Sequence, residues 1–499
     1  MNTPRAKILN KEIFVVDTIE ATANDIAHDV QAYESISLLR VIADLGNHIY
    51  RNRLDFTLYR QVPVNDSFLI FSAVFILNCE SMPNGIDGSN ADLQILFKKL
   101  WFIYDKDCAE EDITPNEMLL RLAYRQFPHQ QELLNGFTRS IYIFRKIWPN
   151  RTQMLGNDIF NETLGLTFDQ VLMHVFLRLS SEQSYFYKLD QETLNKMNGR
   201  LNVAISMASE EAFLNWASRS ANDICKYTGS LDNALQKSPI INMGIVSQQA
   251  DQDAFLILTK NCLYQKVAHY LYFDFIERYR GERGSNIFKT TYGQAFQEYV
   301  GELLKAHFRS WDVIPELTYT KAKNSVSTVD WIVSRGDKLI LLEVKQSSIF
   351  LETKQSGSME SFRKDCKRTL DVAFTQLQTT KTDIEAHSFD ELKFMGKAKS
   401  IEMVCIVADP LYFGNMLLPM IREEYSEMHV INISDLENTL EVQKKDQSLH
   451  YLLSKKRKRQ RLREMDFNEY IISVVKGRAH RSSQFLRDIF DEYFTGLKQ

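Results

Sequence analysis

Apolar side chains recur every three to four positions along much of the first 280 residues, which is the periodicity of amphipathic helices. The clearest case begins at Thr167, where Gln170 completes the pattern of a capping box. The apolar positions that follow it at helical spacing are Val171, Leu172, Val175 and Leu179. The same spacing predicts helices near 30–60, 68–80, 92–104 and 115–147 and one that begins near Ser209. We therefore expect residues 1–280 to form a large, mainly α-helical domain.

The pattern changes near residue 240. Two short apolar runs, 240–246 and 254–259, predict a pair of strands around a polar loop. A long aromatic helix is expected over 261–280. The polar segment GERGSN, residues 281–286, comes next, and we interpret it as the boundary between domains because linkers are commonly polar and contain glycine.

Helices and strands alternate after this boundary. The pattern predicts a helix around 292–304, strands over 326–334 and 339–346, a helix over 360–387, and strands over 401–408 and 429–433. Such alternation is typical of an α/β domain. We expect a central mixed sheet flanked by helices over 286–450, followed by a basic helical C-terminal tail over 451–499.

Composition narrows the classes of function. The net charge of −4 restricts any nucleic-acid surface to a local patch. The six cysteines lie far apart, which excludes a zinc site built on paired cysteines and favours a reducing, cytoplasmic setting. The longest apolar run, 68–77, is too short to span a membrane, so no membrane partner is expected. The motifs GxxxxGK[ST], HExxH and GxSxG are absent from the sequence.

The segment from Val326 to Gln346 carries the chemistry. If Gly336 and Asp337 form a two-residue hairpin turn, glycine supplies the positive φ that such turns need. In that register Asp330 lies directly opposite Glu343, with Cβ atoms about 4.5–5.5 Å apart. Two carboxylates at this distance repel each other, and a divalent cation between them removes the repulsion. The hairpin therefore predicts a cation site.

The two faces of this hairpin differ in character. Lys345, two residues beyond Glu343, points to the same face as Glu343. The opposite face is wholly apolar and is the predicted core: Val329, Trp331, Val333, Leu342 and Val344. Carboxylate oxygens suit Mg²⁺ or Mn²⁺, which polarise a phosphoryl oxygen and lower the pKa of bound water. The alternative interpretation is a surface hairpin whose charges pair across the strands.

At these residues the sequence resembles the PD-(D/E)XK nuclease superfamily. Its core motif, an aspartate on one strand and an acidic-x-Lys on the next, corresponds to Asp330 and Glu343-Val344-Lys345. The resemblance covers about 286–435 and implies a restriction-endonuclease-like fold with a helix on each side of the hairpin. It also implies that Asp330, Glu343 and the Val344 carbonyl bind Mg²⁺ or Mn²⁺, and that Lys345 serves the attacking water.

The flanking helices supply further candidates by the same resemblance. In similar leading helices a glutamate directly follows an aromatic residue, and here that place is taken by Gln297, which is a departure. Gln297 is our first choice for the upstream ligand, and Glu298 and Glu302 are alternatives. In the trailing helix Gln376 matches a glutamine found in many members, with Gln378 as the alternative. Gln297 and Gln376 are equally well interpreted as polar helix surface.

A basic run follows the predicted α/β domain. Its cationic side chains are Lys455, Lys456, Arg457, Lys458, Arg459, Arg461 and Arg463. A helix with this charge can follow a phosphate backbone, and the alternative is a solvated charged face. Four cations that lead into the trailing helix are further candidates for phosphate contact: Arg363, Lys364, Lys367 and Arg368.

Together these patterns predict a metal-dependent endonuclease that hydrolyses phosphodiester bonds, with DNA as the first choice of substrate. Bacterial anti-phage or restriction-type defence is the expected setting by analogy. The helical domain would restrain cleavage until an activating protein ligand binds. The alternatives are a catalytically inactive nucleic-acid-binding module and a protein-interaction scaffold on the same fold.

Overall fold

The computed structural model describes residues 6–8, 11–13, 18–51, 66–79, 85–108, 114–126, 133–151, 155, 158–198, 202–225, 235, 237–244, 253–281, 285–346, 349–387, 389–395, 397–442, 448–475 and 483–496. The chain divides into two compact units. Unit 1 comprises Met1–Phe137, Asp158–Arg278 and Tyr493–Gln499. Unit 2 comprises Thr138–Asn157 and Tyr279–Glu492.

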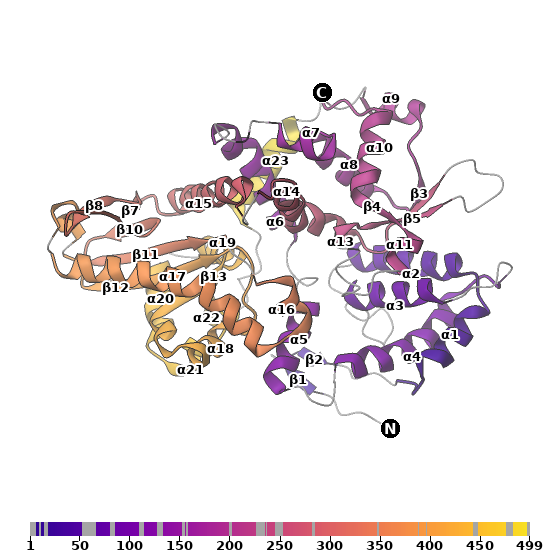
Figure 1. Ribbon diagram of the computed structural model, residues 1–499, viewed down its shortest axis with the longest axis horizontal. Helices are drawn as coiled ribbons and strands as arrows, with labels where there is room; N and C mark the ends of the chain where they lie inside the picture. Colours follow the sequence, from indigo (N-terminus) through magenta and orange to yellow (C-terminus); the bar gives the residue numbers. More distant parts are fainter. Residues whose placement is uncertain are drawn as a thin grey trace. The chain divides into compact units, whose positions relative to one another are not determined.

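Unit 1 is mainly helical, as the periodicity predicts (Figure 1). The predicted capping box at Thr167 is confirmed and begins α8. Parts of the helices predicted over 30–60 and 115–147, namely 52–60 and 127–132, lie outside the described residues. The helices are α1 (Ala23–Gln31), α2 (Ser35–Arg51), α3 (Asp66–Asn78), α4 (Asn90–Cys108), α5 (Pro115–Gln126), α7 (Ile159–Leu164), α8 (Phe168–Ser180), α9 (Gln191–Asn198), α10 (Met207–Ala217), α11 (Ala221–Cys225), α13 (Lys260–Gln265) and α14 (Leu271–Arg278). Helix α6 (Leu133–Tyr142) begins in unit 1 and ends in unit 2.

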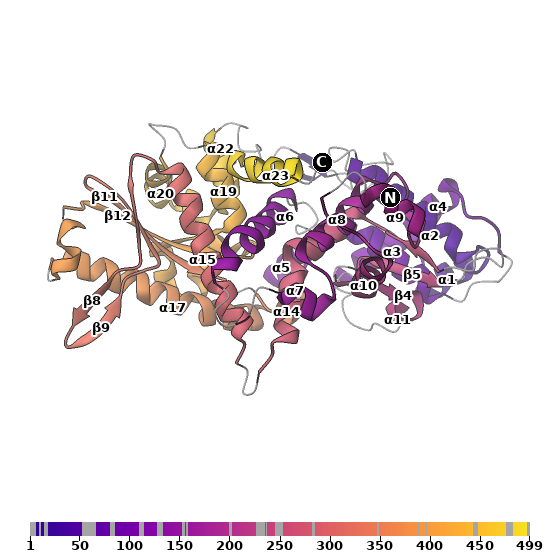
Figure 2. The same ribbon diagram turned by 90° about the horizontal axis from the view of Figure 1, so that it is seen from above.

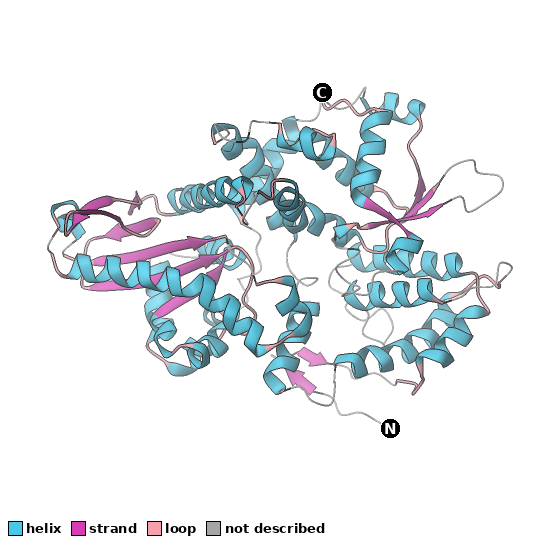
Figure 3. Cartoon of the chain, in the orientation of Figure 1, coloured by secondary structure: helices cyan, strands magenta, loops and turns pink. Residues whose placement is uncertain are grey.

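A small sheet completes unit 1, in addition to the short pair β1 (Ala6–Ile8) and β2 (Lys11–Ile13) (Figure 3). Its strand order is β3 (Tyr185–Tyr187), β6 (Ala254–Leu256), β5 (Ile240–Gly244) and β4 (Ser218–Ser220). The antiparallel pair β5–β6 confirms the two strands predicted near 240 and 254, whereas β3 and β4 were not predicted.

Two helices predicted in unit 1 are interrupted. The helix that begins near Ser209 ends at Ala217, because Ser220 starts a new helix by accepting a hydrogen bond from the Asp223 N–H at 3.1 Å. The aromatic helix over 261–280 contains a π-helical turn at Lys266–Tyr270 between α13 and α14. The buried ammonium of Lys266 donates to Asp274 at 2.7 Å beside this turn.

Unit 2 contains a five-stranded mixed sheet (Figures 1 and 3). The strand order is β13 (Met428–Asn432), β12 (Ser400–Val407), β11 (Lys338–Lys345), β10 (Trp331–Arg335) and β7 (Asp312–Pro315). Strands β11, β12 and β13 are parallel, and β10 is antiparallel to both of its neighbours. The predicted central mixed sheet is thus present.

The prediction of one continuous strand over 326–334 is wrong. The run 326–334 is divided between β9 (Asn324–Ser327), which pairs with β8 (Thr318–Lys321) in a separate hairpin, and β10. The chain leaves the ladder at Thr328–Asp330, where the Thr328 hydroxyl accepts a hydrogen bond from the Leu317 N–H at 2.9 Å. This break frees the backbone beside Asp330 from the ladder that joins β10 to β11.

Helices cover both faces of the sheet. Helix α17 (Met359–Glu385) packs on the face that carries Lys345, and α15 (Ile287–His307) packs on the face that carries Trp331 (Figure 2). Helix α20 (Leu449–Arg457) lies against β11 and β12. The remaining helices are α16 (Leu351–Ser356), α18 (Gly414–Ile421), α19 (Ile433–Val442), α21 (Gln460–Glu464), α22 (Phe467–Val475) and α23 (Gln484–Gly496), whose last residues belong to unit 1.

The division into units differs from the expected domains in two ways. Residues 138–157 belong to unit 2, where the buried guanidinium of Arg139 donates to Glu437 at 2.7 Å. Residues 451–492 are part of unit 2 rather than a separate tail, because α20 packs on the sheet. The boundary expected at 281–286 lies close to the start of unit 2 at Tyr279, and 282–284 are outside the described residues.

Within the described ranges, no helix is both long enough and apolar enough to cross a membrane.

Candidate active site at the β10–β11 hairpin

The hairpin register agrees with the prediction. Trp331 pairs with Leu342 and Arg335 pairs with Lys338 across a turn at Gly336 and Asp337. Gly336 has a φ of 63°, in the region that favours glycine. Asp330 directly precedes β10 and lies just beyond the last register pair, Trp331 with Leu342. Its charge raises the pKa of Glu343, so the two carboxylates are neighbours. The apolar face is buried as expected: Val329, Trp331, Val333, Leu342 and Val344.

Asp330 is held against β11. Its carboxylate accepts a hydrogen bond from the main-chain N–H of Val344 at 2.6 Å. Burial raises the pKa of Asp330 to about 6, even though this hydrogen bond and the Lys345 charge lower it. Glu343 is only 1% exposed, and burial together with the Asp330 charge raises its pKa to about 7. The Asp330 charge therefore disfavours ionisation of Glu343 at neutral pH.

Lys345 connects the hairpin to α17. Its ammonium donates to Glu343 Oε1 at 2.6 Å and to Gln376 Oε1 at 3.1 Å. The structure thus brings Gln376 to the site. The alternative, Gln378, directs its Oε1 into the interior, where no hydrogen bond to it is found among the described residues.

The second carboxylate oxygen of Glu343 provides a test of whether a cation fits. Glu343 Oε2 is buried and has no hydrogen-bond partner in the described part of the chain. An ionised oxygen without a partner is costly to bury, and a divalent cation would satisfy it. The paired carboxylates and this oxygen fit Mg²⁺ or Mn²⁺. No group of three His, Cys, Asp or Glu side chains that could hold a metal occurs within the described ranges, so protein carboxylates would supply two of the ligands.

The upstream candidates on α15 are not joined to this site. Glu298 accepts from Arg151 at 2.7 Å, and Glu302 accepts from Lys305 at 2.9 Å. No hydrogen bond or ion pair of the described residues links either of them, or the Gln297 side chain, to Asp330 or Glu343. Two ligands of one cation need not bond to each other, so an upstream ligand on α15 stays a prediction.

The main chain of Gln297 nevertheless has a positioning role. Its carbonyl oxygen accepts a hydrogen bond from the Trp331 indole N–H at 2.9 Å. Gly301, one turn further along α15, lies so close that a Cβ atom there would be 1.9 Å from the Trp331 ring. Helix α15 therefore fixes the residue that directly follows Asp330.

The sequence did not reveal two neighbours of the site. Glu316 directly follows Pro315, the residue of β7 that pairs with Trp331, and its charge raises the pKa of Asp330 further. Recognising β7 would have revealed Glu316, but a four-residue strand that ends in proline gives little signal. Cys405 pairs with Glu343 in the parallel ladder, and burial raises the pKa of its thiol well above the ordinary value.

The basic run is not one continuous cationic helix. Helix α20 ends at Arg457 and α21 begins at Gln460. Lys456 is 1% exposed and donates to the Arg463 carbonyl at 2.8 Å, and burial lowers the pKa of its ammonium to about 8. Arg457 donates to the buried Glu402 at 3.0 Å. The prediction that Lys456 contacts nucleic acid is therefore wrong, because its ammonium is interior. Arg457 pairs with an interior acid, but its side chain is 40% exposed, so its contact with nucleic acid stays a prediction.

The rest of the run remains available to solvent. Lys455 is partly exposed and lies 5.9 Å from the centre of the Tyr451 ring. The exposed cations of the run are Lys458, Arg459, Arg461 and Arg463. The four candidates at the start of α17 are exposed as well: Arg363, Lys364, Lys367 and Arg368.

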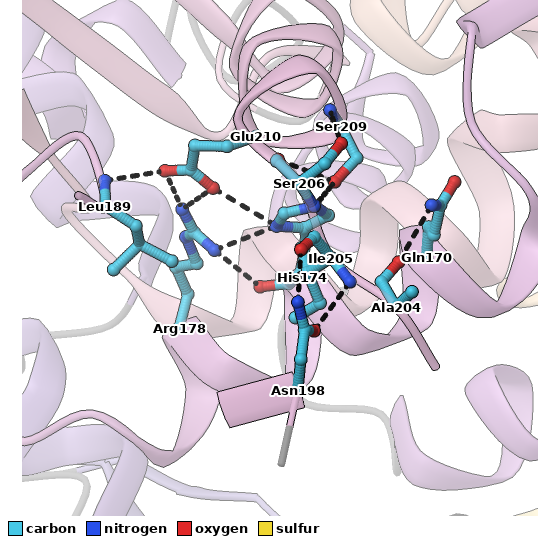
Figure 4. Close-up of polar contacts among 10 residues, drawn as sticks. All are labelled: Gln170, His174, Arg178, Leu189, Asn198, Ala204, Ile205, Ser206, Ser209 and Glu210. Atoms are coloured by element: carbon cyan, nitrogen blue, oxygen red, sulfur yellow. Dashed lines mark hydrogen bonds and ion pairs between the residues drawn. The ribbon is translucent and has the colours of Figure 1, made fainter. Parts of the chain in front are cut away.

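Unit 1 contains a second polar cluster, in which a serine contacts a histidine and the histidine contacts a glutamate, as in a hydrolase triad (Figure 4). Ser209 Oγ lies 3.2 Å from His174 Nε2, and His174 Nδ1 lies 3.2 Å from Glu210. Arg178 donates to both carboxylate oxygens of Glu210, and although burial opposes ionisation, His174 and Arg178 hold the pKa of Glu210 at about 2.

This cluster is structural. Ser209, His174 and Glu210 are each at most 4% exposed, so a substrate cannot reach the hydroxyl. The Ser209 hydroxyl is already engaged, because it donates to the Ser206 carbonyl at 2.9 Å and accepts from the Ser206 N–H at 2.8 Å. The network ties α8 to α10, and we assign it no catalytic role.

Neither family models, nor curated proteins, nor solved structures give a match to this chain.

Proposed function

We propose that unit 2 is a metal-dependent nuclease with a restriction-endonuclease-like fold and that its substrate is a nucleic acid, with DNA as the first choice. One observation carries the proposal: the carboxylates of Asp330 and Glu343 are neighbours on one side of a sheet, and Lys345 donates a hydrogen bond to Glu343. A mixed sheet with an aspartate before one strand and an acidic-x-Lys on the next, and with a helix on each face, supports the same conclusion.

The cation would be held by Asp330, Glu343 and the Val344 carbonyl. When bound, it polarises a phosphoryl oxygen and lowers the pKa of a water molecule. The Val344 N–H keeps Asp330 oriented, and Glu343 has an oxygen to spare after accepting from Lys345. These residues would thus offer neighbouring carboxylates to a cation on the sheet face.

Lys345 would act on the reacting phosphate, and Gln376 would act on the attacking water. An ammonium has three N–H bonds, and two of them donate to Glu343 and Gln376. The third can donate to a phosphoryl oxygen as negative charge builds on it in the transition state. The Gln376 carbonyl oxygen accepts from Lys345, which leaves its amide N–H groups to orient the attacking water.

Exposed cations would hold the rest of the nucleic acid. Those at the start of α17 and in the Lys458–Arg463 segment are placed on unit 2, the unit that carries the site. Contacts of this kind bind phosphates without reading sequence. The sequence contains no motor motif, so cleavage would require restraint from another part of the chain.

We propose that unit 1 supplies this restraint and responds to an activating protein ligand, in bacterial anti-phage or restriction-type defence. The chain passes between the units at four places, after Phe137, Asn157, Arg278 and Glu492. Such an arrangement couples the folding of the two units more closely than a single hinge would. A fragment that begins at residue 286 lacks 138–157 and would expose the surface of α15 that this segment covers.

The test is a cleavage assay with the full chain on plasmid, linear duplex and single-stranded DNA and on RNA, with Mg²⁺ or with EDTA. The proposal expects cleavage that needs Mg²⁺ and disappears in the Asp330→Asn variant. Lys345→Met should lose cleavage as well. Binding without cleavage of any substrate would instead indicate an inactive nucleic-acid-binding module, and neither binding nor cleavage would indicate a protein-interaction scaffold.

A further inference from the structure

An exposed aromatic ring lies beside the helix that contacts Lys345. Phe350 is 55% exposed, and the Arg368 guanidinium lies 3.6 Å from the centre of its ring. The backbone beneath the ring is fixed, since the Phe350 N–H donates to Asp365 at 2.8 Å. Asp365 is 2% exposed and also accepts from the Thr353 hydroxyl at 2.8 Å. Phe350 is therefore an exposed ring with one face against the Arg368 guanidinium.

The ring is linked to the candidate site by one row of side chains on α17. Lys364, Arg368, Val372 and Gln376 are spaced four residues apart and so form one ridge that winds slowly around the helix, with Arg368 and Gln376 about 80° apart. Gln376 is the member that contacts Lys345. At 1.5 Å per residue, Arg368 lies about 12 Å along the helix from Gln376. Val372 between them is 54% exposed, so the row continues as accessible surface.

The charge around the ring fits a polyanion. Arg363, Lys364, Lys367 and Arg368 are exposed cations. Asp365 is buried and lies 3.7 Å from the Arg368 guanidinium, and Asp371 accepts from Arg422 and Tyr425, each at 2.7 Å. Glu360, in the first turn of α17, is an exposed acid among these cations. Cations together with an exposed aromatic ring are the combination that binds single strands, with the cations on the backbone and a base stacked on the ring.

We propose that Phe350 and Arg368 form a stacking platform for an unpaired base of the substrate strand. A base inside a duplex has its faces covered by its neighbours, so an exposed ring can stack only on a base that is unpaired or at an end. The inference rests on the proposed function and narrows its substrate class to nucleic acid that is single-stranded beside the cleaved bond. Single-stranded DNA and single-stranded RNA share this chemistry.

The platform is tested by binding, with cleavage prevented. Full-length protein carrying Asp330→Asn is titrated with DNA and RNA single strands that carry 2-aminopurine at successive positions, and with the same DNA as a duplex. Stacking quenches 2-aminopurine fluorescence at one or two adjacent positions of the single strand. Phe350→Ala should abolish that quenching and weaken single-strand binding about 5- to 100-fold.

Three further variants separate stacking from other effects. Phe350→Trp should keep the quenching, and Phe350→Leu, which retains an apolar side chain without an aromatic face, should behave like Phe350→Ala. Met420→Ala removes a side chain of similar exposure, 57%, on α18 and should change nothing. A preference for DNA or for RNA in the wild-type titration identifies the polynucleotide.

Two outcomes overturn the inference: unchanged quenching in Phe350→Ala, or the same loss of affinity for duplex and single strands. These outcomes differ from failure of the proposed function. Cleavage by the wild-type chain that does not depend on Phe350 refutes the platform and leaves the nuclease. Quenching that depends on Phe350 in a chain that cuts nothing leaves the platform and refutes the nuclease.

Discussion

Replacing Asp330 by asparagine should stabilise the metal-free protein at neutral pH. Asparagine has the same shape, and its carbonyl oxygen can still accept the hydrogen bond from the Val344 N–H. What it removes is a charge that burial and the neighbouring carboxylates make unfavourable. A residue kept solely for stability would show the opposite response.

The size and the sign of the effect follow from the pKa values. The pKa of Asp330 rises from 3.8 to about 6 and that of Glu343 from 4.5 to about 7. At 1.36 kcal/mol per pKa unit, each ionised carboxylate costs about 3 kcal/mol. A group whose pKa is raised by folding contributes its stability fully below the unfolded pKa and loses it as pH rises through the folded pKa. The loss therefore falls between about pH 4 and pH 7.

The assay is urea denaturation of the wild-type and Asp330→Asn chains in metal-free buffer at pH 4 and pH 8. At pH 4 the free energies of unfolding should differ by less than about 1 kcal/mol, and at pH 8 the variant should be more stable by about 3 kcal/mol. Adding Glu343→Gln should give less than twice this gain, because the Asp330 charge that raises the pKa of Glu343 is already absent in Asp330→Asn.

A matched control isolates the cation. Burial and the Asp466 charge raise the pKa of Asp435 to about 7, so Asp435→Asn should show a similar pH dependence. At pH 8, Mg²⁺ at one hundred times its dissociation constant should add about 2.7 kcal/mol to the wild type and to Asp435→Asn but nothing to Asp330→Asn. Equal stability of wild type and Asp330→Asn at pH 8, or equal Mg²⁺ effects on all three proteins, would refute the reasoning.

Three further predictions concern packing and charge. Gly301→Ala should destabilise unit 2 by about 1–3 kcal/mol, because the added Cβ meets the Trp331 ring. Gly293→Ala, on the same helix, adds its Cβ in open space and should stabilise unit 2 by about 0.5–1 kcal/mol. Thermal denaturation of both variants measures the two effects. Arg457→Met should lower the free energy of unfolding by about 1–3 kcal/mol, measured by urea denaturation, because the buried Glu402 loses the hydrogen bond that Arg457 donates to it. An unchanged free energy of unfolding would mean that this pair does not stabilise the fold. A variant with glutamine at the four exposed cations Lys458, Arg459, Arg461 and Arg463 should bind duplex DNA more weakly. The slope of log K against log salt should flatten by about 0.9 for each phosphate that the variant no longer neutralises. An unchanged slope would mean that these side chains contact only solvent.

The hairpin was predictable because its information is local. A glycine at the turn and a strict alternation of apolar and polar positions set the register, and the register brings Asp330, the residue before β10, to the part of β11 that carries Glu343. The capping box at Thr167 is local in the same way. Glu316 escaped prediction because its place beside Asp330 depends on β7, a short strand that pairs with β10 across the intervening β8–β9 hairpin.

Long-range contacts account for the main errors. Arg139 and Glu437 are separated by 298 positions, and nothing near either residue indicates that 138–157 belongs to unit 2. A run of lysine and arginine predicts an exposed face, yet Lys456 is interior because it donates to the Arg463 carbonyl and lies near Asp466. Periodicity identifies the apolar side of a helix but does not identify which cation turns inward.

The most direct test of the central claim is to count the Mn²⁺ ions bound by the metal-free chain at pH 8, by electron paramagnetic resonance. The opposed carboxylates predict at least one bound ion in the wild type and one fewer in Asp330→Asn and in Glu343→Gln. Lys345→Met should keep the wild-type count, because an ammonium is not a ligand. The same count in all four proteins would contradict the claim that Asp330 and Glu343 form a cation site.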